Sequence, residues 1–273
     1  MNKKTPTLFL AAVALAVPAA NASIVLYSSD FGGSSSTDLN DQSVITSGAT
    51  EAQHTQYGTS ASAAWSAATN FKADGSFGYT GTTPGTTTQS FSGTLAFTPQ
   101  NGHIYSLTMT TNVDFTPTKS VGWFATGFLE NSGYTGAITS ANGGGNVWML
   151  TRPGDETVGA LDQAAHYNVS AGTGSQTFNP LAEDTSAPSS ITIVLNTTLG
   201  TGNWSAQYFV GNTLAASVAD LNAVTINSVG IAANIRNNDN TGQFQSFELS
   251  VIPEPSTALL GGLGMLLMFR RRR

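Results

Sequence analysis

The chain contains no cysteine among its 273 residues. This absence excludes a disulfide framework, a thiolate metal site and a cysteine nucleophile. Charged residues are also scarce, at 10% of the chain, against about 25% in an average globular protein. Glycine and small polar residues separate short apolar runs instead, which is typical of an all-β chain with many tight connections.

Positive charge is scarcest in the middle of the chain. Only four basic residues lie between positions 23 and 252, namely Lys72, Lys119, Arg152 and Arg236. Fifteen acidic residues lie in the same segment, which leaves a balance near −11. Nucleic acid is therefore excluded as a partner, because a phosphate backbone requires a basic stripe on the protein.

The first 22 residues have the layout of a secretory signal peptide. Two lysines, an apolar stretch of ten residues and a proline lead to the small-residue triplet Ala20, Asn21 and Ala22. This order predicts cleavage after Ala22. A membrane anchor is the alternative interpretation, but ten apolar residues are too few to cross a hydrocarbon core of about 30 Å. We therefore expect residues 1–22 to be removed and residues 23–252 to form the exported domain.

The last 21 residues, 253–273, have three parts in a fixed order. Pro253, Glu254 and Pro255 come first, then an apolar run over about 257–269, then Arg270, Arg271, Arg272 and Arg273. The first proline is expected to stop the preceding strand, and the run is expected to enter lipid as a helix. Such a helix reaches roughly 20 Å, so flanking residues must snorkel or the bilayer must thin. The arginines are expected to hold its end on the cytoplasmic side as a membrane stop.

These three parts closely resemble the PEP-CTERM sorting signal of Gram-negative bacteria. The resemblance implies processing near the motif by an exosortase, a membrane-embedded cysteine transpeptidase, and a link with exopolysaccharide production. It further implies that the protein is anchored in the inner membrane before processing and then reaches the cell envelope or the extracellular space. The resemblance covers only the end of the chain, so it predicts a destination and not what the exported domain does.

Between its ends the chain predicts about a dozen short strands. The expected strands lie at 23–28, 92–97, 104–110, 121–129, 147–150, 190–195, 204–210, 213–218, 229–235 and 243–251. Residues 32–64 are expected to form a long loop, with one short strand near Val44 and Ile45. Gly211 and Asn212 predict a two-residue hairpin turn. The last strand needs a bulge, because strict alternation cannot place Phe244 and Phe247 on one face.

The paired runs at 191–197 and 204–211 resemble the curved-sheet hairpin of concanavalin A/laminin-G-like jelly rolls. The opening strand, which leads to Asp30 and Phe31, and the closing strand also fit, since such domains pair their first and last strands. The expected fold class is all-β: a two-sheet antiparallel sandwich, jelly-roll-like, flanked by a signal helix and a short C-terminal transmembrane helix.

No catalytic arrangement emerges from the spacing of the residues. No two acids are separated by one residue, so no strand presents two carboxylates on one face toward a sugar. Glu130 and Glu248 are the acids embedded in apolar runs, and each is expected to face solvent. The histidines, His54, His103 and His166, are expected to lie exposed in loops. The protein is therefore predicted not to be an enzyme.

Calcium is the metal that the sequence brings into consideration. Residues 237–240 read Asn, Asn, Asp, Asn, and Ca²⁺ binds six to eight oxygen ligands. The same residue types also make ordinary hairpin turns. Two further acidic groups are considered, Asp38 with Asp41 and Asp155 with Glu156 and Asp162. One carboxylate in the loop is few, so no metal and no cofactor is predicted.

Tryptophan rings are candidates for stacking on sugars. Trp123, Trp148 and Trp204 lie in strand-like runs, where packing in the core is favoured. Trp65 lies between alanines and serines, and for it both a core position and a glycan-stacking role stay open. The favoured function is a non-enzymatic envelope or matrix component that binds polysaccharide weakly. A glycan-processing enzyme on a jelly-roll scaffold is the competing class, and a purely structural module is the third.

Overall fold

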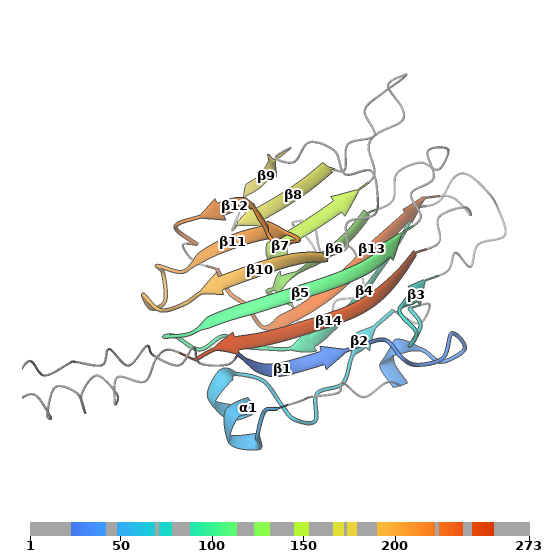
Figure 1. Cartoon of the computed structure of the whole chain (residues 1–273), viewed down its shortest axis with the longest axis horizontal. Coiled ribbons are helices and arrows are strands. Elements are labelled where there is room, and N and C mark those ends of the chain that lie inside the picture. The colour runs from blue at the N-terminus through green and yellow to red at the C-terminus, as the bar shows by residue number, and fades with distance from the viewer. Residues whose placement is uncertain are drawn as a thin grey trace, which may run out of the picture. The chain divides into compact units, whose positions relative to one another are not determined.

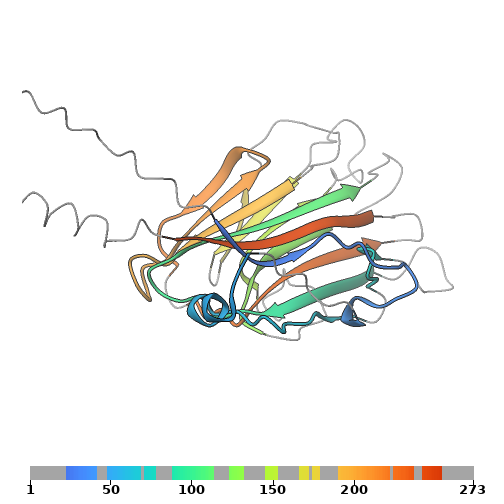
Figure 2. The ribbon, with the colours of Figure 1, turned by 60° about the horizontal axis from the view of Figure 1, so that its bottom comes forward.

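The computed structural model describes residues 23–41, 48–68, 71–77, 88–113, 123–131, 145–152, 166–171, 174–178, 190–221, 224–236 and 242–253. They belong to one unit that runs from Ser23 to Glu254. Their strands form two antiparallel sheets that lie one in front of the other (Figure 1). Figure 2 shows the two sheets as separate layers. The structure thus confirms a mostly-β architecture of two antiparallel sheets.

The sheet nearer the viewer in Figure 1, here called the front sheet, has the order β1-β14-β5-β10-β11-β12, with β3 beside β14. Its strands are β1 (Ile24–Ser29), β3 (Ser76–Phe77), β5 (Ile104–Val113), β10 (Ser190–Asn196), β11 (Ser205–Val210), β12 (Thr213–Val218) and β14 (Gly242–Ile252). The first and last strands pair antiparallel, as expected, and Ile24 lies opposite Val251. β10, β11 and β12 form the expected meander.

The sheet behind it, here called the back sheet, has the order β2-β4-β13-β6-β7-β8-β9. Its strands are β2 (Ser66–Ala67), β4 (Thr88–Ala96), β6 (Trp123–Leu129), β7 (Gly145–Arg152), β8 (His166–Ala171), β9 (Gly174–Phe178) and β13 (Ser228–Arg236). Consecutive strands pair in β6-β7-β8-β9 and in β10-β11-β12, but each sheet also joins strands that are distant in sequence, such as β1 with β14 and β4 with β13. Both sheets therefore depend on long-range pairing.

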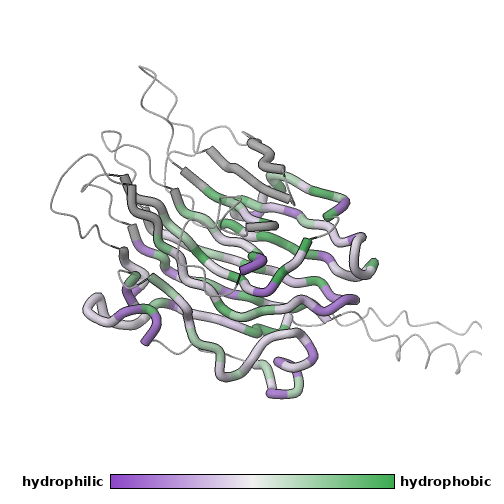
Figure 3. Tube along the Cα trace, turned by 180° about the vertical axis from the view of Figure 1, so that it is seen from behind, coloured by the Kyte–Doolittle hydropathy of each residue, from purple (hydrophilic) through white to green (hydrophobic). Residues whose placement is uncertain are grey.

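The main core fills the space between the sheets. It is built from alternate residues along the strands, because successive side chains of a strand point to opposite faces. Tyr105, Leu107, Ile193 and Tyr208 contribute to it and are fully buried. Figure 3 shows the resulting mixture of apolar and polar residues along the described strands.

Two local features that the sequence predicted are present. The pairing of β14 with β5 shifts register between Phe244 and Ser246, and this bulge lets both Phe244 and Phe247 enter the core. Val210 pairs with Thr213 across the expected two-residue turn. Gly211 has a φ of 54°, and a glycine with positive φ at the first turn position is typical of a type II′ hairpin.

The segment expected to be a long loop contains regular structure. It holds the short 3-10 helix η1 (Leu39–Asp41) and the α-helix α1 (Glu51–Tyr57). The capping box of Thr50 and Gln53 starts α1, and Gly58 ends it in the left-handed conformation. The expected strand near residues 44 and 45 lies outside the described residues.

The strands β8 and β9 were not expected from the sequence. β6 lies within the expected range 121–129, and β7 is longer at both ends than the expected 147–150. β14 ends at Ile252, immediately before Pro253, as expected. Within the described part of the chain, no helix has the length and apolar character needed to cross a membrane. The expected signal helix and C-terminal helix lie outside the described residues.

Candidate functional site

The outward side of the front sheet is lined by small polar side chains. Along β10, Ile191, Ile193 and Leu195 are buried, while the residues between them are half-buried and face outward. The same alternation occurs along β5, β14 and β11. We call the resulting surface the hydroxyl face; it comprises Ser28, Ser106, Thr108, Thr110, Thr192, Val194, Asn196, Ser205, Gln207, Ser246 and Glu248.

One row of the hydroxyl face crosses four neighbouring strands. Ser28 of β1 lies opposite Glu248 of β14, which lies opposite Thr108 of β5. Thr108 in turn lies opposite Thr192 of β10, and their hydroxyl oxygens are hydrogen-bonded at 2.9 Å. With strands about 4.8 Å apart, the row is about 14 Å long. It therefore offers a line of hydrogen-bonding groups rather than a single point.

A hollow of about 320 Å³ lies over this row. Its walls come from β1, β14 and β5, and its lining residues are Ser28, Ser29, Asp30, Thr108, Ser246, Phe247 and Glu248. One Asp30 carboxylate oxygen accepts a hydrogen bond from the backbone N–H of Gly32 at 3.0 Å. The side chain of Glu248 is exposed. We call this depression the Glu248 hollow.

A second hollow, of about 300 Å³, lies on the same face nearer to β12. Asn196, Ser205, Gln207 and Ser217 supply amide and hydroxyl groups to it, and Ile104 and Val194 supply apolar contact. Gln207 is exposed and lies between Val194 and Ser217 in the register of the sheet. Two depressions that each combine polar groups with a larger share of apolar surface therefore lie on one surface.

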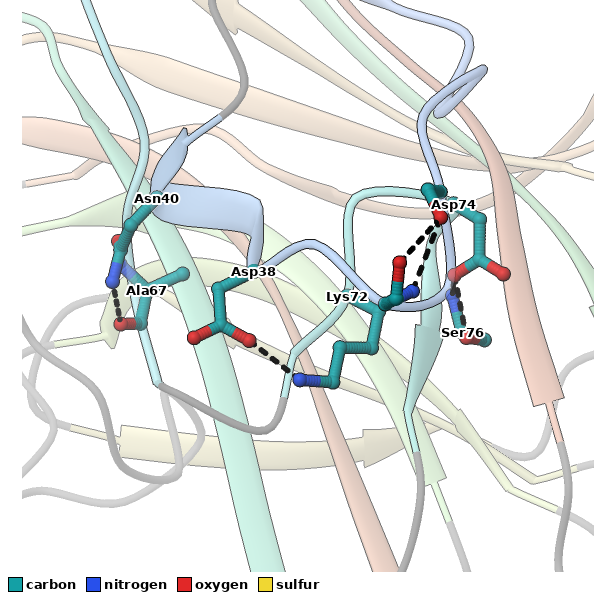
Figure 4. A network of polar contacts seen from close by, with 8 residues as sticks. Asp38, Asn40, Ala67, Lys72, Asp74 and Ser76 are labelled. Carbon is teal, nitrogen blue, oxygen red and sulfur yellow. Dashed lines mark hydrogen bonds and ion pairs between the residues drawn. The ribbon is translucent and has the colours of Figure 1, made fainter.

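The described surface carries very little positive charge. Lys72 is the only lysine or arginine whose side chain the structure describes. Its ammonium group forms an ion pair with Asp38 at 2.5 Å (Figure 4). No described cation therefore faces the hydroxyl face, where Glu248 contributes a negative charge.

The polar contacts around Lys72 hold a loop in place (Figure 4). The side-chain amide of Asn40 both donates to the backbone carbonyl of Ala67 and accepts from its N–H. Asp74 accepts hydrogen bonds from Ser76. Lys72 thus pairs with Asp38, one of the two acids, Asp38 and Asp41, that were considered together for calcium. Among the described residues no group of three or more His, Asp or Glu could hold a metal ion.

The expectation that Trp65 could stack on a sugar is corrected by its burial. Trp65 is 3% exposed, and its ring lies 5.1 Å from that of Phe247 and 6.1 Å from that of Phe31. Gly93 makes room for it, since a Cβ at that position would come within 3.1 Å of the indole. The small flanking residues suggested exposure, but the opposing glycine allows the ring into the core.

The other tryptophans that the structure describes are also buried, as favoured from the sequence. Trp204 belongs to the main core, and its indole N–H donates to the Asn101 side chain at 3.0 Å. Trp148 is 4% exposed and belongs to a second apolar cluster. Only the backbone of Trp123 is described.

The two acids considered as a catalytic pair lie in different sheets. Glu130 follows β6 of the back sheet, whereas Glu248 lies on β14 of the front sheet. Both side chains are exposed, and Glu130 does not line the Glu248 hollow. The structure therefore does not bring this pair into one cleft.

The expectation of exposed loop histidines is wrong for His54 and for the position of His166. His54 lies in α1 and is 1% exposed. Its Nδ1 lies 2.9 Å from the Thr59 hydroxyl, and its Nε2 has no hydrogen-bond partner. Burial lowers the pKa of His54, against an opposing effect of Glu51.

His166 begins strand β8, and His103 is half-buried against the ring of Tyr57.

Two tyrosines fix the end of the sandwich next to α1. The Tyr27 hydroxyl donates to the Ala96 carbonyl at 2.8 Å and accepts from the Ser60 N–H at 2.9 Å. Burial raises the pKa of Tyr27, partly offset by the Ser60 hydrogen bond. Burial also raises the pKa of Tyr105 to about 12. These hydroxyls stay protonated and serve as structural hydrogen-bonding groups.

Several predicted sites lie outside the described residues. These are the cleavage-site residues Ala20 and Ala22, the motif residues Glu254 and Pro255, the arginines Arg270, Arg271, Arg272 and Arg273, and the residues considered for calcium at 237–240, 155, 156 and 162. The cleavage site, the sorting motif and the membrane stop stay predictions, and the calcium alternatives stay untested.

No family model and no curated protein matches the chain. Among solved structures it is similar to the carbohydrate recognition domain of Emp46p in the metal-free form, with 15% sequence identity and a TM-score of 0.45. That match covers 78% of this chain and 93% of the Emp46p domain. It is also similar to the exoplasmic/lumenal domain of VIP36 in the Ca²⁺/Man-bound form, with 13% sequence identity and a TM-score of 0.36. That match covers 59% of this chain and 73% of the VIP36 chain. At this level of similarity no ligand and no residue role transfers to this chain.

Proposed function

We propose that the chain is an exported β-sandwich protein that binds polysaccharide weakly through the hydroxyl face and has no enzymatic activity. The observation that supports this is the band of mostly hydroxyl and amide groups that faces outward across β1, β14, β5, β10 and β11, interrupted by Val194 and Phe209, with two hollows along it. Sugars present closely spaced hydroxyls that both donate and accept hydrogen bonds. Serine, threonine, asparagine and glutamine side chains do the same.

The hollows are open, so a short oligosaccharide would keep much of its surface in water. We therefore expect dissociation constants on the order of 1 mM for short oligosaccharides, which corresponds to about −4.1 kcal/mol. A polysaccharide repeats the same unit many times, so one strand offers many equivalent sites that many copies of the protein can occupy. Weak single-site binding therefore suits a matrix component.

The test is a calorimetric titration of the full chain, in a detergent without a sugar headgroup, with neutral hexasaccharides and with exopolysaccharide fragments. Gln207→Ala removes an amide from the second hollow and should weaken binding at least threefold. Gln56→Ala removes an amide from the exposed side of α1 and should leave binding unchanged. Absence of binding by the wild-type chain to every glycan would favour the purely structural module.

The sorting tag extends this proposal to the destination of the protein. The pairing of Ile24 with Val251 brings Ser23 and Pro253 to the same end of the β1/β14 pair. Cleavage after Ala22 and near Pro253 would therefore leave every described strand intact. In this proposal an exosortase processes the chain, which passes from the inner membrane to the envelope or the extracellular matrix. Mass spectrometry of the mature protein from an exosortase-bearing host should find a C-terminus near residues 253–255; a mature protein that still ends at Arg273 would contradict this.

A further inference from the structure

We infer that the Glu248 hollow selects glycans that carry free amino groups, with a sugar ammonium group placed against the Glu248 carboxylate. This inference rests on the proposed function, because it specifies the class of polysaccharide that the hydroxyl face binds. It follows from the negative charge that Glu248 and Asp30 bring to a hollow otherwise lined by uncharged residues. A neutral glycan would fit the hydroxyl groups but would gain nothing from that charge.

The position of Glu248 is the first step in the argument. Its Cα partners are Ser28 on one side and Thr108 on the other, so the carboxylate lies within a row of hydroxyls. A sugar that lies along this row would place its substituents beside the carboxylate while its hydroxyls meet the neighbouring Ser and Thr groups. The Thr108–Thr192 hydrogen bond continues the row and orients its hydroxyls.

The charge balance of the domain is the second step. Lys72 is the only lysine or arginine whose side chain is described, and it pairs with Asp38, so no described lysine or arginine neutralises Glu248. Asp30 also lines the hollow. A uronic acid would meet this negative charge with its own, and like charges repel each other at close range. The charge of the hollow thus disfavours anionic glycans and favours cationic ones.

The expected preference is modest, because an exposed ion pair is screened by water and salt. Measured exposed pairs contribute about 0.2–1 kcal/mol, which corresponds to an affinity ratio of up to about fivefold. The preference should shrink as salt is added, since the Debye length falls from about 10 Å at 0.1 M to about 3 Å at 1 M. Deprotonation of the sugar amine at high pH should abolish it.

The experiment compares two hexasaccharides that differ only in the amine. The full chain is titrated with the β-1,4-linked glucosamine hexamer and with its N-acetylated form, which carries no charge, and with a galacturonate hexamer as the anionic probe. We expect the amino form to bind three- to fivefold more tightly than the acetylated form, and the anionic hexamer to bind most weakly. Glu248→Gln should narrow the difference between the amino and acetylated forms by weakening only the amino form, with the Asp30 carboxylate left in the hollow.

Glu130→Gln is the matched control, because Glu130 is also an exposed carboxylate but lies beside the back sheet. It should leave the preference unchanged. Equal binding of the amino and acetylated hexamers by the wild-type chain would overturn this inference while leaving the proposed function standing. Loss of the preference in Glu130→Gln with retention in Glu248→Gln would overturn the location. Binding of no hexamer at all would count against the proposed function itself.

Discussion

The outer faces of the two sheets are built from different residues. The front sheet presents the hydroxyl face, whose members apart from Val194 and Glu248 are uncharged polar residues. The outward residues at the centre of the back sheet form a buried apolar cluster of Ala125, Leu129, Trp148, Leu150 and Ala232. A strand exposed on one side alternates apolar and polar residues, whereas a strand buried on both sides is a continuous apolar run. The outer face of the front sheet is therefore the described face open to a ligand.

The largest expected effect comes from the inner face of the front sheet. Phe247 is 1% exposed in the core, so Phe247→Ala should lower the free energy of unfolding by about 3–5 kcal/mol. Glu248 is the next residue and points outward, so Glu248→Ala should change it by less than about 0.5 kcal/mol. Urea denaturation of both variants measures the difference. Similar losses in the two variants would contradict the assignment of faces.

A second pair of variants tests the difference between the outer faces. Trp148 is 4% exposed on the back sheet, so Trp148→Ala should cost about 3 kcal/mol or more. Phe209 is half-buried on the front sheet, so Phe209→Ala should cost about 1 kcal/mol through partial loss of buried area. Thermal and urea unfolding check both values. A larger cost for Phe209→Ala would show that the front sheet is the covered one.

A third, smaller effect concerns the buried histidine of α1. Because burial lowers the pKa of His54, the folded state favours the neutral imidazole. Its contribution to stability is complete above the unfolded pKa of about 6.5 and is lost as the pH falls below that value. Unfolding measured at steps from pH 8 to pH 5 should show this loss. His54→Gln should remove that part of the pH dependence, and an unchanged profile would contradict the assignment.

The smallest effect distinguishes outward from inward threonines. Thr108→Val removes the hydroxyl pair with Thr192 on the outside and should cost about 0.5 kcal/mol, because water replaces the lost partner. Thr126 is fully buried, and its hydroxyl donates to the Gly230 carbonyl at 2.9 Å. Thr126→Val should cost about 1 kcal/mol or more, since that carbonyl loses a buried partner. Equal costs would mean that the outer hydroxyls are as enclosed as the inner one.

The strands of the front sheet could be predicted from the sequence because their alternation follows directly from burial on one side. The bulge at Phe244 and Ser246 could be predicted for the same reason, since three apolar residues had to share a face. α1 was missed although the capping box of Thr50 and Gln53 is visible in the sequence, because seven residues are too few for helical periodicity to stand out. Its stability depends on packing rather than on propensity.

The candidate site was harder to predict because it depends on pairing between distant strands. Glu248 was considered only for catalysis with Glu130, and nothing in its neighbours indicates Thr108 or Ser28 as partners. The sequence left a core position and a stacking role both open for Trp65, because its burial depends on Gly93, which is close in space and not in sequence. The alternation of apolar and polar residues along a strand predicts which face of the sheet a residue lies on. It does not predict which residue lies opposite on the neighbouring strand, because that depends on the pairing register.

The most direct test of the hydroxyl face is a methyl NMR titration of the full chain, labelled at threonine methyl groups, with the glucosamine hexamer. The account predicts that the resonances of Thr108, Thr110 and Thr192 shift as the hexamer is added, while the buried Thr126 of the back sheet stays in place. Binding detected by calorimetry without shifts at these three threonines, or with the largest shifts at threonines outside the front sheet, would contradict the account.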